Sequence, residues 1–367
     1  MSRPLRVLYL AHSVSASGGG MERQSHALLS AESSDLAFTV IASDGLNELP
    51  TSVTTVKLRL PRRPAVVRIV WFYLLSARYV RRLQTDVDVV HACGALTSER
   101  VDLATVHLCH AAVSSDARST LSGWRKINAD LARRAGLAIE RRQYRRSAVK
   151  RLVAVSPSVA RELAAFYPDV PRSVVQNGVD VGRFQGPTRA PRSDDSLLRV
   201  VMVAGDFSLK GVDLAMNAVT HVPRTQLRVV GRGALEQYRA KASSLGVDDR
   251  VSFLGQISDV VGVYGDSDVV LCVSNYESFG LYLVEAALAG CAVIATPVGV
   301  APELLGSNQG GIGIEHTVES LIAALVALRD DPARVQQCAA YAANAARQFS
   351  TDAMRAGYLA QYRELAP

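Results

Sequence analysis

Short apolar runs rich in β-branched residues alternate with amphipathic helical patterns along the whole chain. The segment after the first run, MERQSHALLSAES, has apolar residues at helical spacing. Alternation of this kind is typical of a parallel sheet with helices on both faces. The first series of predicted strands covers residues 6–12, 37–43, 87–94, 103–110 and 151–156.

The pattern restarts after a segment with the composition of a linker. Residues 177–196 are rich in Gly, Pro, Asp and Ser, which favour turns and loops. We therefore predict an α/β chain with two Rossmann-like, doubly wound domains, 1–176 and 177–345, that face a central cleft. A C-terminal helix over 346–367 is expected to pack back on the first domain. The second strand series covers residues 198–206, 226–231, 250–255, 268–274 and 291–297.

Composition indicates a globular protein and suggests its cellular location. The chain has 367 residues, with 49% hydrophobic and 20% charged, which is a globular balance. The start lacks a clean signal-peptide core and cleavage site. The apolar stretch 66–80 contains Arg68 and Arg78, so it is too short and too charged to span a bilayer. Five scattered cysteines form no C-x-x-C pair, which favours reduced thiols and a cytoplasmic location.

Charge is distributed unevenly between the two halves. Residues 1–176 hold 25 Lys and Arg against 14 Asp and Glu, a net charge of +11, whereas residues 177–367 hold 16 against 20, a net charge of −4. A basic half suggests contact with an anionic surface or substrate. Arginines crowd residues 61–83 and 124–151. The first stretch carries apolar residues at helical spacing: Val67, Val70, Trp71, Leu74 and Leu75.

Two interpretations of that basic, aromatic helix stay open. It can lie on an anionic membrane surface, as a peripheral contact on the inner face of the cell membrane. Alternatively, its apolar stripe faces the core and its outer face is solvated. Nucleic-acid binding is disfavoured because aromatic residues are only 6% of the chain and no nucleic-acid motif occurs.

Two carboxylates stand in a mostly apolar run, SNYESFGLYLVEAALAG. Glu277 and Glu285 have seven residues between them, and no Lys or Arg occurs between Arg250 and Arg329. Ser274 and Glu277 have the spacing of a capping box, so Glu277 can simply complete a helix start. Glu285 can be a solvated residue on the outer stripe of that helix. A ligand that needs carboxylates is the other interpretation.

The surrounding loop offers donors for an anion. We predict a helix from about Phe279 to Ala289, ended by Gly290. The amides at its start, of Ser278, Phe279, Gly280 and Leu281, can then bind a diphosphate. Glutamates beside them can accept hydrogen bonds from sugar hydroxyls. Gly18, Gly19 and Gly20, after the first strand, form a second candidate phosphate loop, although they match neither G-x-G-x-x-G nor a Walker motif. Lys210, in the loop after the first strand of the second domain, can neutralise phosphate charge.

At this point the chain resembles a known family. NGVDVGRF, LKGVD, YESFGLYLVEAALAG and TPVGVAPELL occur in this order and spacing. They look like retaining GT-B glycosyltransferases of the large family four, and most like the branch with lipopolysaccharide-core glucosyltransferases. The resemblance covers nearly the whole chain and is strongest from 177 to 305.

The resemblance implies roles for individual residues. It assigns Glu277 to the donor sugar hydroxyls, Glu285 to the ribose, and Lys210 and the Gly18–Gly20 loop to the diphosphate. His107 falls where the family often has a histidine near the transferred sugar, with His110 as a close competitor. Relatives commonly have an arginine about six residues before the lysine, where this chain has AGDFSL. Arg232 is the candidate replacement for that cation.

No metal and no bound cofactor are expected. DVD at 86–88 and DSD at 266–268 resemble the D-x-D of metal-dependent sugar transferases, but each lies directly before a predicted strand, at its amino end. Helix dipoles and Lys210 would replace the metal. The resemblance implies a retaining transfer of a hexose from a UDP- or GDP-linked sugar to a cell-envelope glycolipid or polysaccharide precursor. A GT-B-shaped sugar-nucleotide epimerase and a non-catalytic nucleotide-sugar-binding module are the alternatives.

Overall fold

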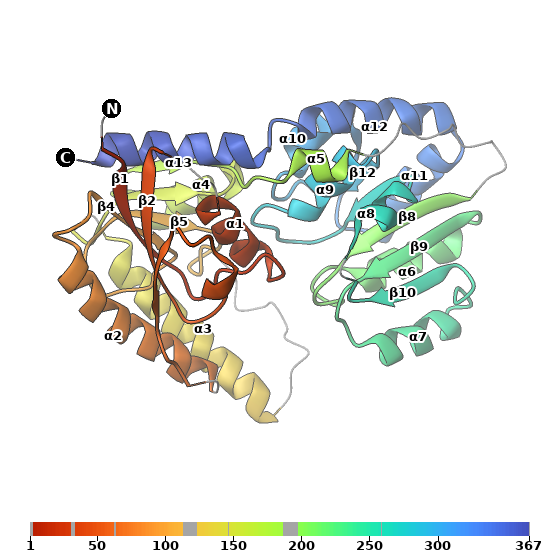
Figure 1. Cartoon of the computed structure of the whole chain (residues 1–367). Coiled ribbons are helices and arrows are strands. Elements are labelled where there is room, and N and C mark those ends of the chain that lie inside the picture. The colour runs from red at the N-terminus through yellow and green to blue at the C-terminus, as the bar shows by residue number, and fades with distance from the viewer. Residues whose placement is uncertain are drawn as a thin grey trace. The chain divides into compact units, whose positions relative to one another are not determined.

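The computed structural model describes residues 3–30, 34–61, 64–112, 123–145, 147–185, 197–257 and 259–366. The chain divides into an N-terminal unit, Met1–Gly178 together with Thr351–Pro367, and a C-terminal unit, Val179–Ser350. Each unit is an α/β structure built on one parallel sheet (Figure 1). Of the predicted linker, residues 186–196 lie outside the described residues.

The N-terminal unit contains a seven-stranded parallel sheet in the order β3-β2-β1-β4-β5-β6-β7. Both faces of this sheet are buried, as alternate residues of β1 show. Val7 and Tyr9 pack in one core cluster with Tyr362, while Leu8 and Leu10 are also fully buried. Burial on both faces explains the continuous apolar runs of the sequence. The strands are β1 Leu5–Leu10, β2 Leu36–Ala42, β3 Thr54–Lys57, β4 Val89–Cys93, β5 Val101–Val106, β6 Val149–Ala154 and β7 Arg172–Val174.

Helices cover this sheet, and their starts follow simple capping chemistry. At the start of α4, the Ser156 side chain accepts a hydrogen bond from the Val159 amide, and Pro157 occupies the first turn. Helices α2 and α3 pack against each other, and α1 packs against α13. The helices of this unit are α1 Gly20–Leu29, the 3-10 helix η1 Leu46–Glu48, α2 Ala65–Leu83, α3 Gly123–Gln143, α4 Pro157–Phe166 and α13 Thr351–Leu365.

The C-terminal helix α13 is held to the N-terminal sheet by a buried polar network. Tyr362 and His91 are fully buried, and the Tyr362 hydroxyl lies 2.7 Å from His91 Nδ1. The Thr105 hydroxyl lies 2.8 Å from His91 Nε2 and 2.8 Å from the Tyr358 hydroxyl. Burial lowers the pKa of His91 to about 3. The imidazole is therefore neutral near pH 7, with one nitrogen that donates and one that accepts.

The C-terminal unit contains a six-stranded parallel sheet in the order β10-β9-β8-β11-β12-β13. Its strands are β8 Leu198–Val203, β9 Thr225–Val230, β10 Val251–Gly255, β11 Val269–Cys272, β12 Ala292–Ala295 and β13 Gly311–Gly313. Its helices are α5 Val181–Phe184, α6 Val212–His221, α7 Leu235–Ser244, α8 Val261–Gly265, α9 Leu281–Leu288, α10 Ala301–Leu305, α11 Val318–Arg329 and α12 Pro332–Ala346. The prediction of two doubly wound, Rossmann-like sheets is confirmed.

Three strands were missed by the sequence pattern. They are the edge strands β3, β7 and β13, each of three or four residues. Most of their residues are at least partly exposed, so they carry no apolar run to mark them. None of the helices in the described part of the chain is long and apolar enough to cross a bilayer.

Candidate active site

Lys210 and Glu277 form an ion pair at the carboxyl edge of the C-terminal sheet. Lys210 lies in the loop after β8, and Glu277 lies in the loop after β11. Gly211 has a φ of +77°, and a side chain there would place its Cβ 2.8 Å from the Val273 carbonyl oxygen. Glycine thus lets the first loop lie directly on the second. The Lys210 ammonium donates to Glu277 Oε1, with side chains 26% and 9% exposed.

Two hydroxyl groups hold the same oxygen of Glu277. The Ser274 hydroxyl donates over 3.2 Å and the Tyr282 hydroxyl over 3.4 Å, both to Oε1. Burial raises the pKa of Tyr282 well above its usual value, so the phenol keeps its proton. Among the described residues, every hydrogen bond to this carboxylate reaches Oε1. Oε2 is therefore available to accept from a ligand hydroxyl.

The capping-box interpretation of Glu277 is wrong. Helix α9 begins at Leu281, and its N-cap is Gly280, with a φ of +89°. Ser274 donates to the Glu277 side chain instead of capping the helix.

The loop after β12 supports the start of α9. Gly299 has a φ of +58°, and a Cβ there would lie 2.3 Å from the Phe279 carbonyl oxygen. The Val300 amide donates to that same oxygen over 2.7 Å. The side chains of Phe279 and Leu281 are 1% and 7% exposed. These two residues can thus offer a ligand only their backbone amides, whereas Ser278 and Gly280 are partly exposed.

Glu285 is buried within α9, only 3% exposed. Its Oε2 accepts a hydrogen bond of 3.3 Å from the Tyr264 hydroxyl. This burial excludes the alternative of a solvated outer stripe. Contact with a ribose remains a prediction, and Tyr264, which the sequence did not point to, orients the carboxylate.

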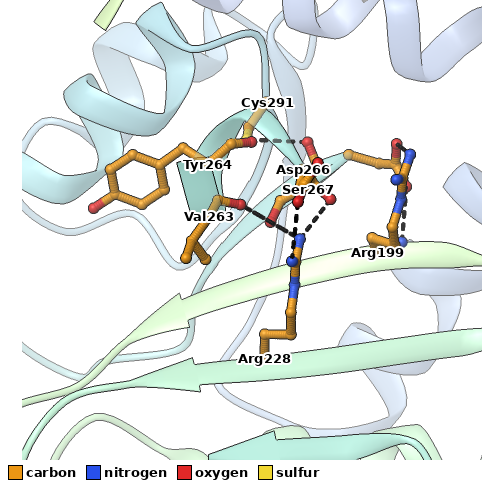
Figure 2. Close-up of polar contacts among 8 residues, drawn as sticks. Arg199, Arg228, Val263, Tyr264, Asp266, Ser267 and Cys291 are labelled. Atoms are coloured by element: carbon orange, nitrogen blue, oxygen red, sulfur yellow. Dashed lines mark hydrogen bonds and ion pairs between the residues drawn. The ribbon is translucent and has the colours of Figure 1, made fainter. Parts of the chain in front are cut away.

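A polar network anchors the short helix α8 that carries Tyr264. Figure 2 shows Arg228, from β9, donating to the carbonyl oxygens of Val263 and Asp266 and to the Ser267 hydroxyl. The Cys291 thiol donates to the carbonyl oxygens of Tyr264, over 3.4 Å, and Ser267, over 3.3 Å. Tyr264 thus reaches Glu285 from a backbone that is fixed on two sides.

Both D-x-D sequences have a structural role at the opposite edge of their sheets. Asp88, before β4, accepts from the Arg6 amide over 2.8 Å and from the Arg3 side chain over 2.8 Å. Asp268, before β11, accepts from the Arg199 amide over 2.8 Å and from its side chain over 3.3 Å. Each carboxylate ties the first strand of its sheet to a neighbour. Within the described ranges, no cluster of three His, Cys, Asp or Glu side chains could hold a metal ion.

The predicted glycine loop lies at the carboxyl edge of the N-terminal sheet. Gly19 caps α1, and its amide donates over 2.8 Å to Glu22 Oε2. A Cβ at Gly18 would lie 2.0 Å from the same oxygen. The Glu22 carboxylate therefore occupies one of the donors expected to face a phosphate. A phosphate-binding role of Gly18, Gly19 and Gly20 remains a prediction.

The two candidate histidines follow β5 in the N-terminal unit. His107 comes directly after the strand and is partly buried, and burial lowers its pKa to about 4, so its imidazole is neutral near pH 7. The His110 ring lies against Gly136 of α3, where a Cβ would be 3.4 Å from Cε1 and Nε2.

Arg232, the candidate second cation, is exposed in the loop after β9 of the C-terminal unit. Among the described residues, no hydrogen bond or ion pair links it to Glu277, the partner of Lys210.

Two family models match the chain, one over each unit. Glycosyltransferase Family 4 matches residues 18–183, and Glycosyl transferases group 1 matches residues 189–347. The D-inositol 3-phosphate glycosyltransferase of Kineococcus radiotolerans is 30% identical over 323 residues, which cover 77% of this chain and 73% of that protein. For D-inositol 3-phosphate glycosyltransferases of Rhodococcus and Segniliparus, the match spans only about half of the relative's length.

Solved structures share the fold. WaaG, a glycosyltransferase involved in lipopolysaccharide biosynthesis, superposes with a TM-score of 0.72 at 19% identity and covers 93% of this chain and 94% of its own. Anabaena HepE in complex with UDP-glucose has a TM-score of 0.68 at 19% identity and covers 98% and 99%. The two sheets are therefore those of the GT-B fold.

Proposed function

Because the chain belongs to the group 1 and family 4 glycosyltransferases, we propose that it is a retaining, metal-independent hexosyltransferase. The donor is a UDP- or GDP-linked sugar. The observation that carries this proposal is the Lys210–Glu277 pair beside the start of α9, which gathers a cation, a carboxylate and helix-end amides at one sheet edge. A sugar diphosphate needs these three groups. HepE, of the same fold, was solved with UDP-glucose, which supports a nucleoside-diphosphate donor.

In the proposed reaction, the bond between the anomeric carbon and the diphosphate breaks. Lys210 and the amides of Ser278 to Leu281 stabilise the negative charge that develops on the departing oxygen. Lys210 leaves Glu277 for the phosphate, and Glu277 then accepts from the sugar hydroxyls. The acceptor attacks from the leaving-group side, and the phosphate oxygen takes its proton. His107, neutral at pH 7, contacts the transferred sugar.

A screen of nucleotide sugars tests this function. We expect one UDP- or GDP-linked hexose to raise the melting temperature and to be hydrolysed slowly without acceptor. Glu285→Ala should lose affinity for the nucleotide itself, whereas Glu277→Ala should keep nucleotide affinity and lose discrimination between sugars. Isothermal titration with the nucleoside diphosphate and with the full donor separates the two effects. A donor that is bound but never turned over would favour the binding module, and conversion of the donor sugar without transfer would favour the epimerase.

The acceptor is proposed to be a cell-envelope glycolipid or polysaccharide precursor, met at an anionic membrane surface on the cytoplasmic side. The stripe on α2 is largely exposed rather than core-facing: Val70, Trp71 and Leu74 are 39%, 51% and 58% exposed. The neighbouring helix α3 adds Trp124 and Ile127, 69% and 52% exposed. Several exposed arginines lie on the same two helices: Arg78, Arg81, Arg82, Arg133, Arg134, Arg141 and Arg142.

This surface predicts salt-sensitive binding to anionic vesicles. Co-sedimentation with phosphatidylglycerol vesicles should weaken steeply between low and physiological salt, because exposed charges are screened. The double change Trp71→Ser and Trp124→Ser should weaken binding about a hundredfold or more, since each aromatic side chain that the membrane buries is worth about 1.5–3 kcal/mol. Leu254→Ala in the C-terminal unit, 39% exposed, is the control and should bind as the parent does. Binding that ignores both salt and the tryptophans would contradict the membrane proposal. Arg62, Arg63 and Arg146 of the basic stretches lie outside the described residues.

A further inference from the structure

Glu140 is a buried carboxylate that the reaction described above does not use. It lies near the end of α3 and is 1% exposed. A carboxylate in this position is costly to bury unless its oxygens accept hydrogen bonds. The donors that reach it from described residues are backbone amides, a tyrosine hydroxyl and a thiol, all of them neutral.

Four hydrogen bonds from described residues converge on this carboxylate, and three of them come from residues 109–111. Oε2 accepts from the His110 amide over 2.8 Å, and Oε1 accepts from the Ala111 amide over 3.0 Å. The Tyr167 hydroxyl donates to Oε1 over 2.8 Å. The Cys109 thiol lies 3.9 Å from Oε1. Both oxygens of Glu140 are thus engaged, and they fix the backbone just beyond His107.

The same face of α3 contacts the 107–111 segment at a second point. Gly136 lies one helical turn before Glu140, and the His110 ring packs against it, 3.4 Å from where a Cβ would be. At the other end, β5 holds Val106 in the sheet by pairing with Ala154 of β6. Residues 107–111 are therefore tied at both ends, and His107 lies at the strand end of this tied segment.

We infer that Glu140 is a positioning residue that holds the 107–111 segment so that the His107 imidazole is presented to the transferred sugar. The inference rests on the proposed function for the role of His107. A carboxylate is needed because both of its oxygens accept. The isosteric amide of glutamine keeps one acceptor and turns an NH2 group toward an amide donor. Glu140→Gln therefore keeps the volume of the side chain and loses one of its two hydrogen bonds to the His110 and Ala111 amides.

The test compares kcat, donor KM and melting temperature in the full-length protein. Glu140→Gln should lower kcat by about tenfold to a hundredfold, because a displacement of about 1 Å at a catalytic group has effects of that size. Donor KM should stay within about twofold, since Lys210, Glu277 and Glu285 belong to the other unit. The control is Tyr167→Phe, which removes the hydrogen bond that Glu140 accepts, within the described part of the chain, from outside the segment. It should lower the melting temperature while kcat changes less than threefold.

A double variant separates positioning from general destabilisation. If Glu140 acts through His107, Glu140→Gln in a His107→Ala background should lower kcat by less than twofold further. If the loss of kcat in the double variant equals the product of the two single losses, the inference is overturned. It is also overturned if the Glu140→Gln variant has parental kcat. Should Glu140→Gln fail to fold, Glu140→Asp tests the same contacts, because the shorter side chain keeps both acceptor oxygens but draws them away from the His110 and Ala111 amides. A smaller loss of kcat is expected, and parental kcat in that variant would contradict the inference.

The inference and the proposed function fail in different ways. If the parent protein turns over no nucleotide sugar, the proposed function fails before Glu140 is tested. If the parent is active and His107→Ala is fully active too, only the roles of His107 and Glu140 fall.

Discussion

Lys210→Met is expected to lower kcat by on the order of a hundredfold or more, the usual effect of removing one preorganised donor to a developing anion. Methionine keeps most of the length of the side chain and removes its charge. The reason lies in the geometry, because Lys210 is the cation that the Gly211 turn brings to Glu277 at the sheet edge. The C-terminal unit has a net negative charge, so no excess of basic residues is available to replace it. Steady-state kinetics with the best donor measures the effect.

The ion pair predicts that its two members do not act independently. Glu277→Gln alone should also reduce kcat, and the double variant should be about as slow as the slower single variant, because the two groups touch each other and the same donor. Lys241→Met provides a matched control. Lys241 also donates to a carboxylate, Asp213, in the same unit, but both side chains are well exposed, 44% and 38%. That variant should keep kcat within twofold. A Lys210→Met enzyme with near-parental kcat would mean that another group carries the diphosphate charge.

Tyr362→Ala is expected to destabilise the N-terminal unit by about 3–5 kcal/mol, as large-to-small changes of buried aromatic residues do. Tyr362 is fully buried under the sheet and also supplies the hydrogen bond to His91. Tyr362→Phe keeps the ring and removes only the hydroxyl. It should cost about 1–3 kcal/mol, because a buried ring nitrogen of His91 is left without its partner.

Urea unfolding followed by circular dichroism measures both changes, analysed with separate transitions for the two units where they appear. Trp124→Ala is the control, since it removes a larger aromatic side chain from the same unit where that side chain is 69% exposed. It should change the free energy of unfolding by less than about 0.5 kcal/mol. If Tyr362→Ala were equally mild, α13 would not contribute to the stability of the sheet as its contacts imply.

The fold was largely predictable because both sheets are covered on both faces. Strands such as β4 and β11 are buried throughout and therefore appear in the sequence as apolar runs. The edge strands β3 and β13 escaped detection because partial exposure and a length of three or four residues leave no such run. The helix predicted from about Phe279 begins two residues later, at Leu281, because Gly280 is its N-cap, with a φ of +89°.

The candidate site was only partly predictable. Glycines, carboxylates and Lys210 could be selected from loops that follow strands, since parallel strands bring those loops to one edge. Tyr264, Tyr282 and Glu140 could not, because a tyrosine or a glutamate in a helix has no local pattern that reveals which distant carboxylate or amide it meets.

The sequence by itself determined the two-sheet architecture. Burial on both faces of a parallel strand requires a continuous apolar run, and the alternation of such runs with helical patterns is visible in the sequence. Only the tertiary structure decided the state of the two carboxylates. Glu277 pairs with Lys210, 67 residues away in sequence, and Glu285 is buried against Tyr264 rather than solvated. Such pairings depend on how loops from different strands meet in space, and hydrophobic periodicity carries no information about that distance.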